Sequence, residues 1–388
     1  MRLQVLPTIL LLLLNAGCQG QPGKPLPAAD RPELYLPLLS GKSVAVVANQ
    51  TSMAGSVQLV DFLLSRNIRV IKIFTPEHGF RGTADAGERI SNGKDPVSGL
   101  PLISLYGSHF KPAPGDLSDL DILIYDIQDV GVRFYTYIST LHYVMEACAE
   151  NNISLIVLDR PDPNGYYCDG NIPDTAFRSF VCMHPVPVVY GMTTGEYAKM
   201  INGEKWLKKG LQCKLTVIKC NNYTHKSHYE LPVRPSPNLQ DQVSVYLYPS
   251  LCLFEGTNIS VGRGTPFPFS VFGSPLLPDR GFSFTPGPTA GSKNPPFSGQ
   301  ECYGTDLRDA VRKKLVPADH IILQLLLDAY KSYPAKDKFF TSYFDVLAGG
   351  PHLREQIEAG MSEKQIRNSW KDGLKRFSEI RKKYLIYD

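Results

Sequence analysis

The feature that most constrains the fold is a regular alternation of short apolar runs and longer amphipathic stretches. Six runs rich in β-branched and aromatic residues have the length and composition of buried strands: 44–48, 68–75, 121–127, 154–159, 186–190 and 215–219. Stretches with apolar residues at helical spacing lie between them, at 57–66, 138–151 and 193–202. Strands that alternate with helices form a parallel sheet with helices on both faces. The first part of the chain is therefore predicted to be an α/β domain.

The alternation stops after about residue 223, where the composition changes. A Pro- and Gly-rich segment follows at 249–299, and helix-like patterns return at 305–314, 320–330 and 363–383. A chain of 388 residues is long enough for two domains of ordinary size. We therefore predict an α/β domain at 37–230 and a smaller α+β domain at 231–388.

The first residues have the pattern of a targeting segment. Arg2 gives a positive end, an apolar run at 9–14 is too short to span a bilayer, and Ala-Gly-Cys ends at Cys18. This pattern predicts a signal peptide at 1–18 with lipid attachment to Cys18, followed by a flexible tether at 19–36. The expected location is extracytoplasmic, as a periplasmic lipoprotein anchored to the membrane. Ordinary signal-peptide cleavage nearby is the alternative.

Composition and motif searches exclude several functional classes. The net charge of +4 comes without a Lys/Arg block, which argues against nucleic-acid binding. No Gly-rich phosphate loop follows the first strand, so neither a dinucleotide nor a nucleoside triphosphate is expected. The G-x-S-x-G motif of α/β-hydrolases is also missing. The cysteines lack zinc-site spacing, and we predict neither a metal nor a cofactor.

Polar residues gather just beyond the carboxyl ends of the predicted strands. The carboxyl ends of parallel strands share one edge of a sheet, which is where ligands bind in open α/β folds. The strand-end candidates for substrate binding are His78, Asn49, Asp126, Arg133, Tyr135, Arg160, Asn164 and Glu196. Other roles are open for some of them: Asp126 could bond nearby backbone amides, Arg133 and Tyr135 could form a surface pair, and Arg160 could form a structural ion pair.

Glu77 is the strongest candidate for catalysis. Pro76 must end the strand before it because proline has no N–H for a ladder. An acid placed directly after a core strand is held by a rigid support, as a catalytic group requires. Glu255 is the second candidate carboxylate, and Arg263 is a further substrate-binding candidate. Both lie in a long irregular segment of the kind that lines clefts between domains.

Six motifs follow one another along the chain: TPEHGFRG at 75–82, DAGE at 85–88, DIQDVGVRFYTY at 126–137, LDRPDPNG at 158–165, GMTTGE at 191–196 and FEGTNISVGRGT at 254–265. Taken in this order, they resemble the motifs of the bacterial exo-β-N-acetylmuramidase family. The resemblance implies a Rossmann-like domain, a smaller C-terminal domain and an active site in the cleft between them. Glu77 matches the glutamate of the family's E-H-G motif. Asp162 departs from the pattern, since Asn is usual there.

The resemblance implies a hydrolase that releases N-acetylmuramic acid from the non-reducing end of peptidoglycan fragments. Two alternatives remain open: a non-catalytic lipoprotein that binds cell-wall fragments, and an α/β enzyme acting on another sugar. Cleaving a glycoside needs an acid and a group that stabilises an oxocarbenium-like centre. Glu255, Asp126, Asp129 or the acetamido group of the substrate could serve as the second group. Arg133, Arg160 and Arg263 are the candidates for binding the lactyl carboxylate of muramic acid.

Overall fold

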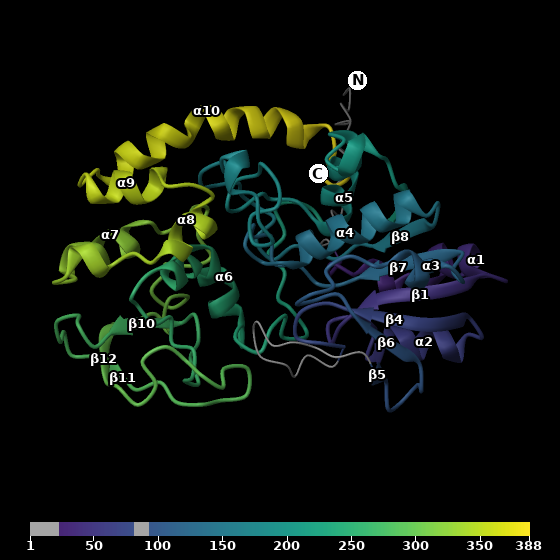
Figure 1. Ribbon diagram of the computed structural model, residues 1–388, viewed down its shortest axis with the longest axis horizontal. Helices are drawn as coiled ribbons and strands as arrows, with labels where there is room; N and C mark the ends of the chain where they lie inside the picture. Colours follow the sequence, from purple (N-terminus) through teal and green to yellow (C-terminus); the bar gives the residue numbers. More distant parts are fainter. Residues whose placement is uncertain (1–22, 81–92) are drawn as a thin grey trace, which may run out of the picture.

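A seven-stranded sheet forms the first half of the molecule (Figure 1). The computed structural model describes residues 23–80 and 93–388. The strands of this sheet are β1 Ser43–Ala48, β4 Arg69–Thr75, β5 Gly93–Lys94, β6 Pro101–Ser104, β7 Ile122–Asp126, β8 Ser154–Leu158 and β9 Lys214–Ile218. Their spatial order is β5-β6-β4-β1-β7-β8-β9, and all neighbours pair in parallel except β5 and β6. With β1 central and successive parallel strands added to either side, the sheet has Rossmann-like topology.

Helices cover both faces of this sheet because its central strands are apolar on both sides. All six residues of β1 are buried, as are all five of β7. One hydrophobic core lies under α1 Pro32–Leu39 and α2 Leu59–Ser65, and the other lies under α4 Tyr137–Glu150 and α5 Thr194–Gly203. The second core continues without interruption into the C-terminal part of the chain.

The second half of the molecule is a smaller α+β unit, drawn on the opposite side of Figure 1. Its three-stranded antiparallel sheet has the order β10-β12-β11. Its elements are α6 Gln242–Leu251, β10 Val271–Ser274, β11 Ser283–Phe284, β12 Cys302–Asp306, α7 Gln324–Ser332, α8 Ser342–Ala348, α9 His352–Glu358 and α10 Glu363–Lys382. The shorter elements of the whole chain are η1 Ala28–Asp30, β2 Met53–Ala54, β3 Val57–Gln58, α3 Pro114–Leu117, η2 Thr175–Phe177, η3 Lys208–Gly210, η4 Cys252–Gly256 and η5 Lys336–Lys338.

The predicted fold class is confirmed, and five of the six predicted strands are present within two residues of their expected bounds. The prediction of a strand at 186–190 is wrong. Val189 makes only isolated bridges, because Pro185 and Pro187 have no N–H to donate to a ladder. The predicted helix at 305–314 is also wrong, since β12 occupies its beginning and turns follow. The strands β5 and β6 were not predicted, because both are short and β6 begins at a proline.

The prediction of a flexible tether at 19–36 is wrong for residues 26–36, because the chain is packed on the sheet from Leu26 onward. Leu26 bridges to Asn221, and the N–H of Ala28 donates to the carbonyl oxygen of Asp159 over 2.8 Å. Ala28 and Tyr35 are fully buried. The signal peptide at 1–18 and Cys18 lie outside the described residues. Within 23–80 and 93–388, no helix is both long and apolar enough to cross a membrane.

The last helix connects the two units. Figure 1 shows α10 running from the C-terminal unit back towards the large sheet, so that the end of the chain lies beside α5. The N–H of Ile386 donates to Glu196 over 2.9 Å, and the hydroxyl of Tyr387 donates to Asp159 over 2.7 Å. Residues from the end of the chain therefore complete the hydrogen bonding of the first domain.

Candidate active site

A cavity of about 480 Å³ lies at the carboxyl edge of the large sheet, with walls from both halves of the molecule. The first half contributes Glu77 and His78 after β4, Tyr106 after β6, and residues 134–137, which lead into α4 and include its first residue. The second half contributes Glu255, Arg263 and Tyr343, together with residues of the 291–296 loop. An open α/β sheet binds ligands at this edge, next to the strand where the chain order reverses.

Glu77 is held at the wall of the cavity by the turn that ends β4. The backbone N–H of Gly79 donates to the carbonyl of Pro76 over 3.1 Å, and both His78 and Gly79 have positive φ angles, 71° and 76°. The side chain of Glu77 accepts a hydrogen bond at Oε2 from the hydroxyl of Thr136, 2.9 Å away. A sharp turn and a fixed hydrogen bond together orient this carboxyl group.

His78 and the tyrosines near it tie the cavity wall to the linker before α6. His78 Nε2 lies 3.3 Å from the hydroxyl of Ser236, and the hydroxyl of Tyr135 donates to the carbonyl of Pro235 over 2.7 Å. Tyr137 accepts a hydrogen bond from Asn49 Nδ2 over 2.9 Å. Burial, followed by the negative charge of Glu77, raises the pKa of Tyr137, so its phenol remains a neutral hydrogen-bonding group.

Glu255 faces the same cavity in a different electrostatic environment. Arg263 Nε donates to Glu255 Oε1 over 2.6 Å, and the guanidinium lies 5.0 Å from the ring centroid of Phe269. Burial is the largest single influence and acts to lower the pKa of Arg263, but the charge and the hydrogen bond of Glu255, with smaller contributions from Tyr248 and Cys252, together outweigh it and the pKa is raised. The thiol of Cys252 is the other contact of this carboxylate, 3.6 Å from Oε2.

Tyr343 lies within the electrostatic reach of both carboxylates. Burial is the largest cause of the raised pKa of its phenol, and the charges of Glu255 and Glu77 both add to it. The two acids thus share one cavity, one beside a threonine hydroxyl and the other beside an arginine. A pair of carboxyl groups in different environments is the arrangement that glycoside hydrolysis uses.

Arg160 and Asp126 form a buried ion pair beneath the cavity. Arg160 Nε lies 2.6 Å from Asp126 Oδ1, and a terminal nitrogen lies 2.8 Å from Oδ2. A terminal nitrogen of Arg160 also donates to the carbonyl of Met53 over 2.9 Å. Neither side chain is part of the cavity lining. The interpretation of Arg160 as a structural ion pair therefore fits this geometry, with Asp126 as the partner.

Arg133 is fully buried and joins the two halves of the molecule. Its guanidinium donates to the carbonyls of Asn171 and Val186 in the first half, and to those of Leu347 and Ala348 at the end of α8. Cations are favourable at helix C-termini, where carbonyl groups lack partners. Arg133 is thus neither a surface residue nor a cavity residue, and its contacts are those of a structural cap.

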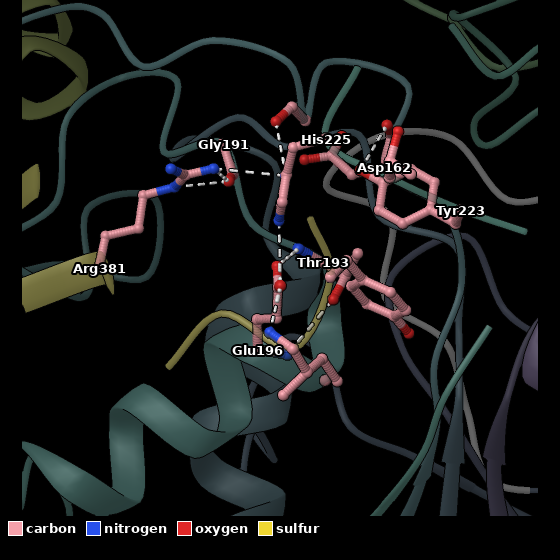
Figure 2. Close-up of polar contacts among 12 residues, drawn as sticks. Asp162, Gly191, Thr193, Glu196, Tyr223, His225 and Arg381 are labelled. Atoms are coloured by element: carbon pink, nitrogen blue, oxygen red, sulfur yellow. Dashed lines mark hydrogen bonds and ion pairs between the residues drawn. The ribbon is translucent and has the colours of Figure 1, made fainter. Parts of the chain in front are cut away.

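Asn49, Asn164 and Glu196 do not line the cavity, and their side chains make hydrogen bonds to other parts of the protein. Asn164 Nδ2 donates to the carbonyls of Val130 and Val245. Figure 2 shows Glu196 facing His225, whose Nε2 lies 3.0 Å from Glu196 Oε1. In the same view Arg381 reaches the carbonyl of Gly191, 2.8 Å from its Nε. This cluster fastens the end of α10 to the first domain.

Of the predicted site residues, the structure brings five together around the cavity: Glu77, His78, Tyr135, Glu255 and Arg263. Several cavity residues were not predicted, among them Thr136, Tyr343 and Lys293. Thr136 could have been found, because it lies inside the motif at 126–137. Tyr343 and Lys293 lie outside every motif, and only the packing of the second unit brings them to the cavity.

The fold and the cavity define a class of protein: a two-domain α/β protein whose cavity between the domains holds two carboxyl groups, as glycoside hydrolysis requires. The comparisons agree with this class. The N-terminal family model of the exo-β-N-acetylmuramidase NamZ matches residues 44–243, and the C-terminal model of the same family matches residues 246–387. The chain belongs to this family. The resemblance expected from the sequence motifs is confirmed.

Known relatives cover nearly the whole chain. The peptidoglycan β-N-acetylmuramidase NamZ of Bacillus subtilis strain 168 is 40% identical over 372 residues, which cover 91% of this chain and 89% of that protein. Two crystal structures of DUF1343 family proteins from Bacteroides fragilis NCTC 9343 have the same fold. One is 43% identical with a TM-score of 0.86, and the other is 28% identical with a TM-score of 0.77. Each alignment covers 94% of this chain and 99% of the solved chain.

Proposed function

We propose that this protein is an exo-acting glycoside hydrolase that releases N-acetylmuramic acid from the non-reducing end of peptidoglycan fragments, with Glu77 as its general acid. Membership of the family supports the reaction class. The observation that carries the residue assignment is the placement of Glu77, fixed by Thr136 in the same cavity as Glu255. A catalytic acid must be both positioned and able to reach the leaving oxygen.

In the proposed reaction Glu77 donates its proton to the glycosidic oxygen of the terminal muramyl residue. The bond between that oxygen and the anomeric carbon breaks, and its electron pair stays with the oxygen of the departing sugar. Positive charge develops at the anomeric carbon, water adds to it, and one proton of that water returns to the carboxylate of Glu77, which gives free N-acetylmuramic acid and restores the acid. Glu255 is held in place by its hydrogen bond from Arg263, and its negative charge stabilises the positive charge at the anomeric carbon.

Arg263 is the best placed of the predicted cations to recognise the lactyl carboxylate that distinguishes muramic acid from glucosamine. Arg160 donates to Asp126, Arg133 donates to carbonyls of both halves of the molecule, and neither lines the cavity. Arg263 lines the cavity and uses Nε for Glu255, while its terminal nitrogens pair with none of the described residues. Guanidinium forks bind carboxylates in two parallel hydrogen bonds, which makes this contact selective.

The test is product analysis with a muramyl–glucosamine disaccharide. The wild-type protein should release N-acetylmuramic acid, and Glu77→Gln should lower kcat by at least about 10²-fold, because loss of general acid catalysis typically costs 10²–10⁴. A nitrophenyl muramide, whose leaving group needs no proton, should recover much of that loss. Glu230→Gln, at an exposed position of the first half, is the matched control. Near-wild-type kcat in Glu77→Gln would remove Glu77 from the role of acid.

We also propose that the protein is a lipoprotein, acylated at Cys18 and facing the periplasm. The proposal is supported by the positive Arg2, the apolar run at 9–14 and the small residues before Cys18. Cell fractionation of the full chain should place the wild type with membranes, and Cys18→Ala should move it to the soluble fraction. A wild-type protein that fractionates as soluble would contradict the anchor.

A further inference from the structure

Four aromatic side chains form a continuous cluster beside the cavity, which we call the aromatic shelf: Tyr106, Phe110, Tyr143 and Phe180. The ring centroids of Phe110 and Phe180 are 4.3 Å apart, and those of Tyr106 and Phe180 are 6.0 Å apart. The ring of Tyr143 lies 6.4 Å from both Phe110 and Phe180 and is nearly parallel to them, at 23° and 16°. Three segments distant in sequence thus present a set of stacked rings.

The shelf is not part of either hydrophobic core. None of its residues is fully buried, and none is among the half-buried side chains that pack against the two cores. Burial of apolar surface in the cores therefore does not account for four large rings at this place. The four rings are half-buried, so part of each remains accessible, and an accessible apolar cluster next to a polar site is a candidate binding surface.

The shelf is fixed in place by the segments that carry it. Tyr143 projects from α4, and the hydroxyl of Ser139 on the same helix donates to the carbonyl of Phe180 over 2.6 Å. The loop of Phe180 is thereby fastened to the helix of Tyr143. Rings held before a ligand arrives lose little conformational entropy when it binds.

The shelf begins inside the active-site cavity and extends beyond it. Tyr106 and Phe180 line the cavity together with Glu77, whereas Phe110 and Tyr143 are not among its lining residues. We propose that the shelf binds the sugar rings that follow the scissile bond, so that the enzyme prefers glycan strands longer than a disaccharide. This inference rests on the proposed function, since it assigns the path of the substrate on the departing side of that bond.

Aromatic rings and the charges around them match the chemistry of a glycan. A pyranose ring has apolar C–H faces and a polar rim, so it can stack on an aromatic side chain while its hydroxyl groups stay in water. Among the charged groups near the shelf, Lys111 pairs with Glu146 and Glu150, and His109 pairs with Asp116. The guanidinium of Arg178 contacts His142 and Met183. The apolar faces of sugar rings fit this aromatic surface better than a charged peptide does.

The test measures the release of N-acetylmuramic acid from two substrates. One is the muramyl–glucosamine disaccharide, and the other is a tetrasaccharide of two muramyl–glucosamine repeats. Ring stacking contributes about two- to tenfold per ring, so wild-type kcat/KM should be at least about fivefold higher for the tetrasaccharide. The double variant Phe110→Leu/Tyr143→Leu keeps apolar volume and loses the aromatic faces. In this variant, kcat/KM for the tetrasaccharide divided by kcat/KM for the disaccharide should fall towards one. The main cause should be a higher KM for the tetrasaccharide. Melting temperatures check that the variant is folded.

Phe282→Leu is the matched control, because this half-buried ring pairs with Phe284 in the C-terminal unit and does not line the cavity. It should leave the ratio at the wild-type value. A wild-type ratio near one, or an unchanged ratio in the double variant, would overturn the proposal. Calorimetry on Glu77→Gln separates this inference from the proposed function. Tighter binding of the tetrasaccharide that is lost with the two leucines supports the shelf even if no hydrolysis is seen.

Discussion

Thr136 donates its hydroxyl hydrogen to Oε2 of Glu77 across 2.9 Å, so one oxygen of this carboxyl group is fixed at the cavity wall. A hydrogen bond to one oxygen restricts rotation of the whole carboxyl group, so the other oxygen is held in orientation as well. If Glu77 is the general acid, as proposed, Thr136 is a positioning residue for it.

Thr136→Val keeps the shape of the side chain and removes the hydrogen bond. Its loss should lower kcat by about five- to tenfold, in line with a hydrogen bond worth about 1 kcal/mol. KM should change little, because the substrate contacts remain. Thr136→Ser keeps the hydroxyl and should restore most of kcat. Steady-state kinetics on the disaccharide separate these results, and an equal loss in both variants would argue against the positioning role.

Arg263→Lys tests recognition of the lactyl carboxylate. A lysine keeps the positive charge but not the planar fork, so the two parallel hydrogen bonds cannot form. KM for the muramyl disaccharide should rise about tenfold, and the preference over a glucosaminyl analogue that lacks the lactyl group should shrink. Arg308→Lys, at the exposed pair with Asp306, serves as the control. Equal wild-type turnover of both substrates would refute lactyl recognition.

Asp129 makes stability depend on pH. Its Oδ2 accepts from Tyr190 and Gly131, whereas the buried Oδ1 has no partner among the described residues. Burial raises the pKa of Asp129 to about 6, above the value near 4 in an unfolded chain. The folded state therefore binds the proton more tightly, and its contribution is complete below about pH 4 and lost as the pH rises through about 6.

Asp129→Asn should remove this dependence. Urea unfolding between pH 4 and pH 7 should show the wild type losing on the order of 2–3 kcal/mol relative to Asp129→Asn as the pH rises. Asp121→Asn, in the turn before β7, is a comparison variant at a more exposed position. A constant difference in unfolding free energy across this range would show that Asp129 is ionised throughout.

Tyr387→Phe tests the connection between the end of the chain and the sheet. The hydroxyl of Tyr387 donates to Asp159 and accepts from the N–H of Cys220, so its removal takes away the partner of that N–H and one of the donors to the buried Asp159, which keeps Thr193 and Gly195. The free energy of unfolding should fall by about 2–3 kcal/mol. Tyr384→Phe removes a hydroxyl bonded only to Glu204, which is partly exposed, and should have a smaller effect. Urea denaturation measures both, and equal effects would contradict a special role for Tyr387.

The alternation of strands and helices was enough to predict the sheet and the edge that carries the site. It could not reveal which strand-end side chains are free to meet a substrate. Arg160 forms an ion pair with Asp126 because β7 and β8 are neighbours in the sheet. This pairing depends on the order of the strands, which the sequence pattern alone does not give. Arg133 caps α8, which begins more than two hundred residues later in the chain. Glu77 was predictable because its position depends only on Pro76 and the strand before it.

The C-terminal residues also set the order in which the molecule can be assembled. Asp159 lies at the end of β8, and Glu196 lies in the first turn of α5, yet both receive hydrogen bonds from residues 386–387. While the chain is being synthesised, the sheet can form long before these partners exist. The first domain therefore emerges from the ribosome with two buried acids still incompletely bonded. The hydrogen bonds of Asp159 and Glu196 are complete only when the second unit has folded and the residues after α10 have packed against the first domain.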